Sequence, residues 1–129
     1  MAGVPLAFWS KTQSNIALSS GEAELNSCVK AISEALGVVH VCDELLNIQF
    51  EVSVHVDSSA CKGMLLRSDA GKVKHLSTKQ LWVQAAAELY GIHVFKIPRA
   101  RNCADVLTHT LPSHSAEPHL RAMGFTLTE

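Results

Sequence analysis

Three acidic residues far apart in the chain occupy positions where carboxylates could do chemistry. Glu24 stands at the start of a helical pattern, Asp57 ends an alternating run, and Asp105 follows a loop that begins at a proline. Grouped carboxylates without basic partners favour divalent cations, and oxygen ligands suit Mg²⁺. If folding brings the three together, the pattern indicates Mg²⁺-dependent phosphodiester chemistry.

Each acid also has a purely structural interpretation, which the local sequence leaves open. A carboxylate such as Glu24 is favoured near a helix N-terminus by the helix dipole. Asp57 could cap the helix that follows it, and Asp105 could be an acid in the first turn of a short helix. Only the joint arrangement of the three separates these interpretations from a metal site.

The acid Glu24 lies on a long predicted helix. Ser19 and Glu22 form a capping box, which predicts a helix that extends to about Leu46. Its buried stripe, at spacings of three and four, consists of Leu25, Val29, Ile32, Leu36, Val39, Cys42 and Leu46. Residues 50–57 then alternate between apolar and polar types, which predicts a strand ending at Asp57. A serine-capped helix follows and ends near Gly71.

The second half of the chain continues the alternation of helices and strands. Ser77 or Thr78 begins a helix to Tyr90, with a buried stripe of Leu81, Trp82, Ala85 and Leu89, and Gly91 ends it. We further predict strands at Val4–Trp9 and 92–97, a brief helix at 104–111 and one helical turn at 120–123. This order predicts an α/β fold with at least one parallel strand pair.

Composition narrows the class of protein. At 129 residues the chain has the length of one domain, and a net charge of −1 means that any nucleic-acid surface must be local. Cys28, Cys42, Cys61 and Cys103 are scattered singly, as expected for free thiols in a reducing compartment. The sequence has no recognisable signal peptide and no apolar run of membrane-spanning length, so we expect an intracellular protein, cytoplasmic or nuclear, without a membrane partner.

Basic residues and histidines supply two further candidate sites. Lys72, Lys74 and His75 form one cluster, and Arg99 with Arg101 forms a second. Either cluster could contact phosphates or simply be a solvated loop. Three histidines, at positions 109, 114 and 119, recur every five residues, which suits neither face of a regular element, and no cysteine pair accompanies them. Zinc is therefore disfavoured.

Five segments, in order, resemble the RNase H domain of copia-type (Ty1/copia) retrotransposon Pol polyproteins: TrpSerLysThrGlnSer, LeuSerSerGlyGluAlaGluLeu, HisValAspSerSerAla, LysHisLeu and AsnCysAlaAspValLeuThr. The resemblance covers most of the chain. It implies an RNase H-like α/β fold and Mg²⁺-dependent endonucleolytic hydrolysis of RNA in RNA–DNA hybrids. It also implies a reverse transcriptase upstream in the same polyprotein, and hybrid recognition through 2′-hydroxyl and phosphate contacts.

The resemblance assigns roles to individual residues. Glu24, rather than Glu22, matches the catalytic glutamate of the family, because a hydrophobic residue of the helix stripe follows it directly. Asp57 and Asp105 match two catalytic aspartates, so these three residues are the expected catalytic residues and ligands of a two-ion Mg²⁺ site. Ser58 stands where the family more often has asparagine, and the Lys74–His75 pair suggests a substrate contact at His75.

The remaining aspartate of the family lies on its first strand and has no counterpart in this sequence. Asp43 cannot replace it, because 19 helical positions separate it from Glu24 by nearly 30 Å. Asp69 lies on a loop between helices and belongs to neither strand. We therefore expect an incomplete carboxylate set and impaired cleavage.

The resemblance predicts a truncated sheet with flanking helices in a single partial domain. Its parts are a strand and turn (1–18), an α/β core (19–111) and a C-terminal tail (112–129). Without the first strands, the sheet edge could pair with another chain. Two other functions stay open: a non-catalytic remnant that binds nucleic acid or a partner protein, and a plain α/β interaction module.

Overall fold

A computed structural model of the chain describes residues 5–13, 16–66, 77–108 and 110–126. They fall into two compact units, each described by itself. The sheet unit is Gln13–Lys96, and the terminal unit is Met1–Thr12 together with Ile97–Glu129. The expectation of a single domain stays a prediction.

The sheet unit alternates helices and strands in the order α1 (Ser20–Leu46), β1 (Ser53–Val56), α2 (Ser59–Leu66), α3 (Ser77–Tyr90) and β2 (His93–Lys96). The two strands pair in parallel, with Ser53 opposite His93 and Val56 opposite Lys96. A parallel pair needs a crossover connection, and the intervening segment contains α2 and α3. The predicted parallel pair is therefore confirmed, whereas the RNase H-like fold stays a prediction.

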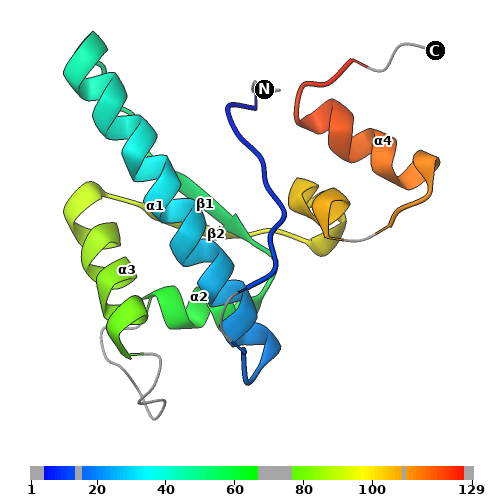
Figure 1. Ribbon diagram of the computed structural model, residues 1–129, viewed down its shortest axis with the longest axis horizontal. Coiled ribbons are helices and arrows are strands. Elements are labelled where there is room, and N and C mark those ends of the chain that lie inside the picture. The colour runs from blue at the N-terminus through cyan, green and yellow to red at the C-terminus, as the bar shows by residue number, and fades with distance from the viewer. Residues whose placement is uncertain (1–4, 14–15, 67–76, 109, 127–129) are drawn as a thin grey trace. The chain divides into compact units, whose positions relative to one another are not determined.

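The core of the sheet unit lies between one face of the two strands and the three helices. In Figure 1, α1 crosses the strands, with α2 and α3 beside it. The buried apolar side chains are Leu25, Cys28, Ile32, Leu36, Val52, Val56, Cys61, Leu65, Val83, Ala86 and Ile92. The opposite face of the strands is exposed at His55, His93 and Phe95, whose rings contact one another with centroid distances of 5.5 and 6.3 Å. The predicted alternation along 50–57 is confirmed.

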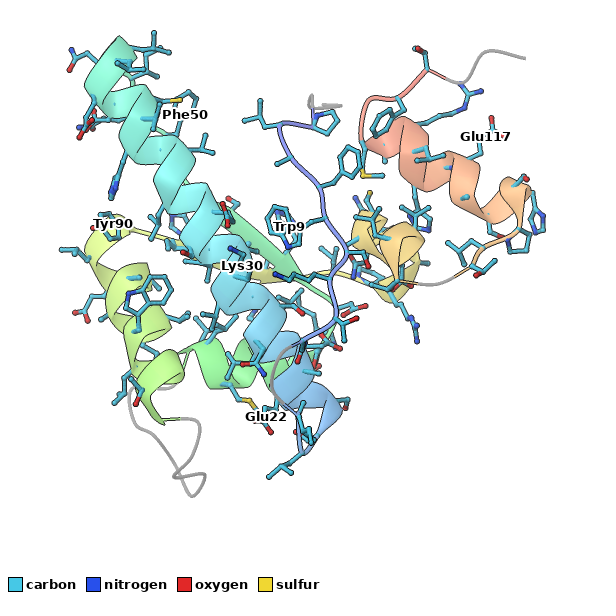
Figure 2. The ribbon with its side chains drawn as sticks, in the orientation of Figure 1. Trp9, Glu22, Lys30, Phe50, Tyr90 and Glu117 are labelled. Carbon is cyan, nitrogen blue, oxygen red and sulfur yellow. The ribbon has the colours of Figure 1, made fainter. Side chains whose placement is uncertain are left out.

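Helix α1 begins as its sequence predicts. The Ser19 hydroxyl accepts a hydrogen bond from the Glu22 backbone N–H at 3.1 Å, and the Glu22 carboxylate accepts one from the Leu18 N–H at 2.8 Å. Figure 2 shows Glu22 at this end of the helix. Full burial along the stripe ends at Leu36, and Val39 and Cys42 are half-buried. Leu46 is 61% exposed, so its predicted burial is wrong. The last turn of α1 extends beyond the core of the sheet unit.

Helix α3 has the predicted bounds but buries a different face. Trp82 is 43% exposed and Leu89 is 74% exposed, whereas Val83 and Ala86 are buried. Three residues of the predicted stripe, Trp82, Ala85 and Leu89, instead line an open groove of about 490 Å³ between α1 and α3. Its other lining residues are Ser33, Leu36, Gly37, His40, Ala86 and Tyr90. Apolar residues follow the helical period on both faces of α3, so spacing alone selected the wrong one.

The terminal unit contains the 3₁₀ helices η2 (Arg99–Arg101) and η3 (Cys103–Leu107) and the helix α4 (Ser113–Ala122), none of which has a buried residue. The predicted helix at 104–111 is thus a shorter 3₁₀ helix, and the predicted turn at 120–123 ends a longer α-helix. Phe8 contacts Phe125 edge to face, with ring centroids 6.2 Å apart.

The predicted strand at Val4–Trp9 is wrong for residues 5–9, and Val4 lies outside the described residues. A strand needs a hydrogen-bonded neighbour. In the described part of the chain the sheet consists of β1 and β2, so residues 5–9 have no such neighbour. None of the helices in the described ranges combines the length and apolar character that a membrane span requires.

Candidate functional site

Asp57 lies where the sequence places it, directly after β1 at the carboxyl end of the parallel pair. Its side chain is half-buried. The next helix is capped by Ser58, whose hydroxyl accepts a hydrogen bond from the Cys61 N–H at 3.1 Å. Ser58 therefore acts as a cap of this helix, and the Asp57 carboxylate lies at the edge of the sheet where ligands bind in open α/β folds.

Glu24 approaches the same region from α1. It is half-buried and lies one position before Leu25, which is fully buried in the core. The charges of Glu24 and Asp57 both act on the Cys28 and Cys61 thiols. Since electrostatic effects of this kind fall off with distance, the two carboxylates lie around one thiol pair. Within the sheet unit, two of the three predicted acids thus lie near the same thiol pair.

The thiol pair itself was not predicted. Cys28 Sγ on α1 lies 3.4 Å from Cys61 Sγ on α2, and both side chains are buried. This hydrogen bond lowers the pKa of Cys28, against the opposing effects of burial and of the two nearby carboxylates. The same hydrogen bond, reinforced by burial and by those carboxylates, raises the pKa of Cys61. All four cysteines are free, as expected, although Cys42 and Cys103 are only half-buried.

Asp105 lies in the terminal unit, in the first turn of η3. Its carboxylate accepts a hydrogen bond from Arg99 Nε at 3.1 Å, and its side chain is 20% exposed. The assumption that the acids have no basic partner is therefore wrong for Asp105. An approach of Asp105 to Glu24 and Asp57 stays a prediction, because those residues belong to the sheet unit.

Neither unit, over the residues described for it, places three or more histidine, cysteine or acidic side chains where they could hold one metal ion. The donors that the sheet unit offers are the carboxylates of Glu24 and Asp57. Their oxygen atoms suit Mg²⁺, which usually takes one or two protein carboxylates and completes its shell with water and substrate phosphate. This donor set fits a metal that is held jointly with substrate.

A basic residue that the sequence analysis missed stands at the same sheet edge. Lys96 is the last residue of β2 and pairs with Val56, the residue before Asp57. Its ammonium group donates a hydrogen bond to the Ser59 hydroxyl at the start of α2. The signal was available, because parallel strands end at a common edge and Lys96 ends the second predicted strand. A phosphate held near Asp57 would therefore find a cation beside it.

Some of the predicted basic and histidine contacts lie within the described residues and others lie outside them. Lys72, Lys74, His75 and His109 lie outside the described residues. Arg99 pairs with Asp105, and Arg101 is exposed on η2. His114 and His119 both lie on α4, where five positions correspond to a rotation of roughly 140°.

Comparison with known proteins gives one relative. The chain is 27% identical over 117 residues to the "Retrovirus-related Pol polyprotein from transposon TNT 1-94" of Nicotiana tabacum. The match covers 90% of this chain and 9% of the relative. No family model and no solved structure matches. The chain is thus related to a segment of a retrotransposon Pol polyprotein.

Proposed function

We propose that this chain is an RNase H-type segment of a copia-like retrotransposon Pol polyprotein, and that its site serves Mg²⁺-dependent hydrolysis of RNA in RNA–DNA hybrids. The observation that carries the proposal is the position of Asp57 at the carboxyl edge of the parallel pair, with Glu24 and Asp57 both acting on the same buried thiol pair. The relation to a Pol polyprotein supports it, because converting an RNA genome to DNA produces hybrids.

In this proposal, acidic residues of the chain bind the metal and basic residues contact phosphates. Glu24 and Asp57 would hold Mg²⁺ through carboxylate oxygens, and Asp105, which pairs with Arg99, stays the predicted third ligand. When bound, Mg²⁺ supplies charge stabilisation and an activated water. Lys96 would attract the scissile strand through a phosphate, and Arg101, Lys72, Lys74 and His75 stay predicted phosphate contacts.

The rest of the polyprotein would complete the fold. In the described residues the sheet has two strands, so the outer edge of β1 presents backbone groups that another strand can bind. Because the matched segment is 9% of the length of its relative, the same polyprotein offers ample additional chain. We propose that upstream residues, next to the reverse transcriptase, pair with this edge and contribute a further carboxylate.

The direct test is cleavage of a hybrid with a labelled RNA strand in Mg²⁺, by this chain and by a longer segment of the same polyprotein. We expect weak cleavage by the chain, stronger cleavage by the longer segment, and a loss of at least about 100-fold in Glu24→Gln and Asp57→Asn. Glu44→Gln, an exposed acid on the same helix, is the matched control and should leave the rate unchanged. Equal cleavage by all variants would overturn the proposal.

A second candidate is a hybrid-binding segment without cleavage. The ion pair between Asp105 and Arg99 favours it, because that carboxylate is already partly neutralised. In this case neither this chain nor the longer segment cleaves RNA. The affinity for the hybrid then falls as the salt concentration rises, but it does not change on substitution of Glu24 or Asp57. Lys96→Ala would then weaken binding, since phosphate contact supplies the affinity.

A further inference from the structure

The buried thiol pair links two helices that are already in close contact. Cys28 lies on α1 and Cys61 in the first turn of α2, 33 positions apart in the sequence, with their sulfur atoms 3.4 Å apart. Two turns before Cys28, a Cβ added to Gly21 would lie 3.3 Å from the Ala60 Cβ. The helices therefore meet with little space between them, and a disulfide, with sulfurs about 2.05 Å apart, requires the two sulfur atoms to approach by little more than one ångström.

We propose that Cys28 and Cys61 are a site of reversible oxidation, at which a two-electron oxidant such as hydrogen peroxide joins α1 to α2 through a disulfide. This oxidation requires neither metal binding nor hybrid cleavage. It concerns only the sheet unit.

The chemistry assigns a different step to each sulfur. Cys28, 9% exposed, is the sulfur that an oxidant reaches, whereas Cys61 is fully buried. The Cys28 thiolate attacks one peroxide oxygen and breaks the O–O bond, so that it becomes a sulfenic acid and the other oxygen leaves as water. Cys61 then attacks the Cys28 sulfur and expels a second water. Together the two thiols lose two protons and two electrons, and the peroxide gains them as it becomes two waters.

The hydrogen bond between the thiols favours this division of roles. It lowers the pKa of Cys28, so that the reactive thiolate forms on that sulfur rather than on Cys61. Cys42 and Cys103 provide internal controls, because they are more exposed than the pair. An oxidant that acted by exposure alone would modify those two first.

The test uses the full chain, reduced and then treated with hydrogen peroxide. Remaining thiols are blocked with N-ethylmaleimide under denaturing conditions, and non-reduced peptides are mapped by mass spectrometry. We expect Cys28 linked to Cys61, with maleimide on Cys42 and Cys103. Maleimide on Cys28 and Cys61, or a link from either of them to Cys42 or Cys103, would overturn the inference. The same treatment in denaturant should give mixed pairings.

Two double variants sharpen the result. Cys42→Ala with Cys103→Ala keeps the pair and should form the monomeric disulfide, with a Tm raised by roughly 5–15 °C that dithiothreitol reverses. Cys28→Ala with Cys61→Ala should show neither effect. If this second variant does not fold, the peptide map and the first variant still decide. A disulfide that lowered the Tm would mean that native packing must distort to form it, and would also count against the proposal.

Discussion

The sheet unit and the terminal unit are stabilised in different ways. The fully buried side chains of the described residues lie between Leu25 and Ile92, all within the sheet unit. In the terminal unit, η2, η3 and α4 bury no residue, and the unit is held by local hydrogen bonds, by ion pairs and by the contact of Phe8 with Phe125. Burial of apolar surface supplies most folding free energy, so the sheet unit should determine the stability of the chain.

The largest effect should follow from a cavity in the core. Ile32 is fully buried on α1, and Ile32→Ala should lower the free energy of unfolding by about 2–5 kcal/mol. Leu45→Ala on the same helix, at a site 77% exposed, should change it by less than about 0.5 kcal/mol. Urea denaturation of both variants measures the contrast. Similar losses would mean that the core is not where the structure places it.

Loss of the α1 cap should rank second. Ser19→Ala removes the acceptor for the Glu22 N–H and should cost about 1 kcal/mol. Ser20→Ala is the neighbouring control and leaves that hydrogen bond in place, so its Tm should stay close to that of the parent. An equal loss in the control would show that the serine pair acts through solvation rather than capping.

One glycine with positive φ lies in each unit, so alanine variants of the two allow a direct comparison of the units. Gly91 ends α3 at φ 62°, and Gly124 follows α4 at φ 90°. Alanine at either position is strained, and the cost should be about 1 kcal/mol. Gly91→Ala should lower the stability of the sheet unit as a whole. Gly124→Ala should accelerate amide hydrogen exchange only around α4. A global loss from the second variant would contradict the separation of the units.

The smallest stability effect should come from Asp105. Its pairing with Arg99 involves an arginine that is 68% exposed, so Asp105→Asn should change the free energy of unfolding by less than about 0.5 kcal/mol. If the cleavage proposal holds, the same variant loses activity far out of proportion to stability. Parallel denaturation and cleavage assays separate the two. A large stability loss would assign Asp105 a structural role.

Local signals explain what the sequence predicted well. The cap, stripe and bounds of α1 depend on residues three or four positions apart, and the alternation that ends at Asp57 depends on immediate neighbours. The prediction of which face of α3 is buried failed, because two faces carry apolar residues and only the packing of α3 against α1 and α2 selects one. The strand at 5–9 failed because pairing is decided by a neighbour and not by composition.

The candidate site, too, could be predicted only in part. The positions of Glu24 and Asp57 within their elements could be predicted, because each element has a clear start or end. The Arg99–Asp105 pair lies within six residues, but charge spacing does not decide whether an acid meets a base or a substrate. The contact between Cys28 and Cys61 depends on how two helices cross, which no local pattern encodes.

The length of α1 has one more consequence. Its 27 residues make a rod of about 40 Å, and full burial stops at Leu36. Beyond it, Val39 still packs against the core and His40 contacts Tyr90, whereas Val38, Val41, Leu45 and Leu46 face solvent. Fraying should therefore begin at Asn47 and stop where the core begins. The backbone hydrogen bonds of α1 should be least protected in its last turns and most protected where the helix packs on the core.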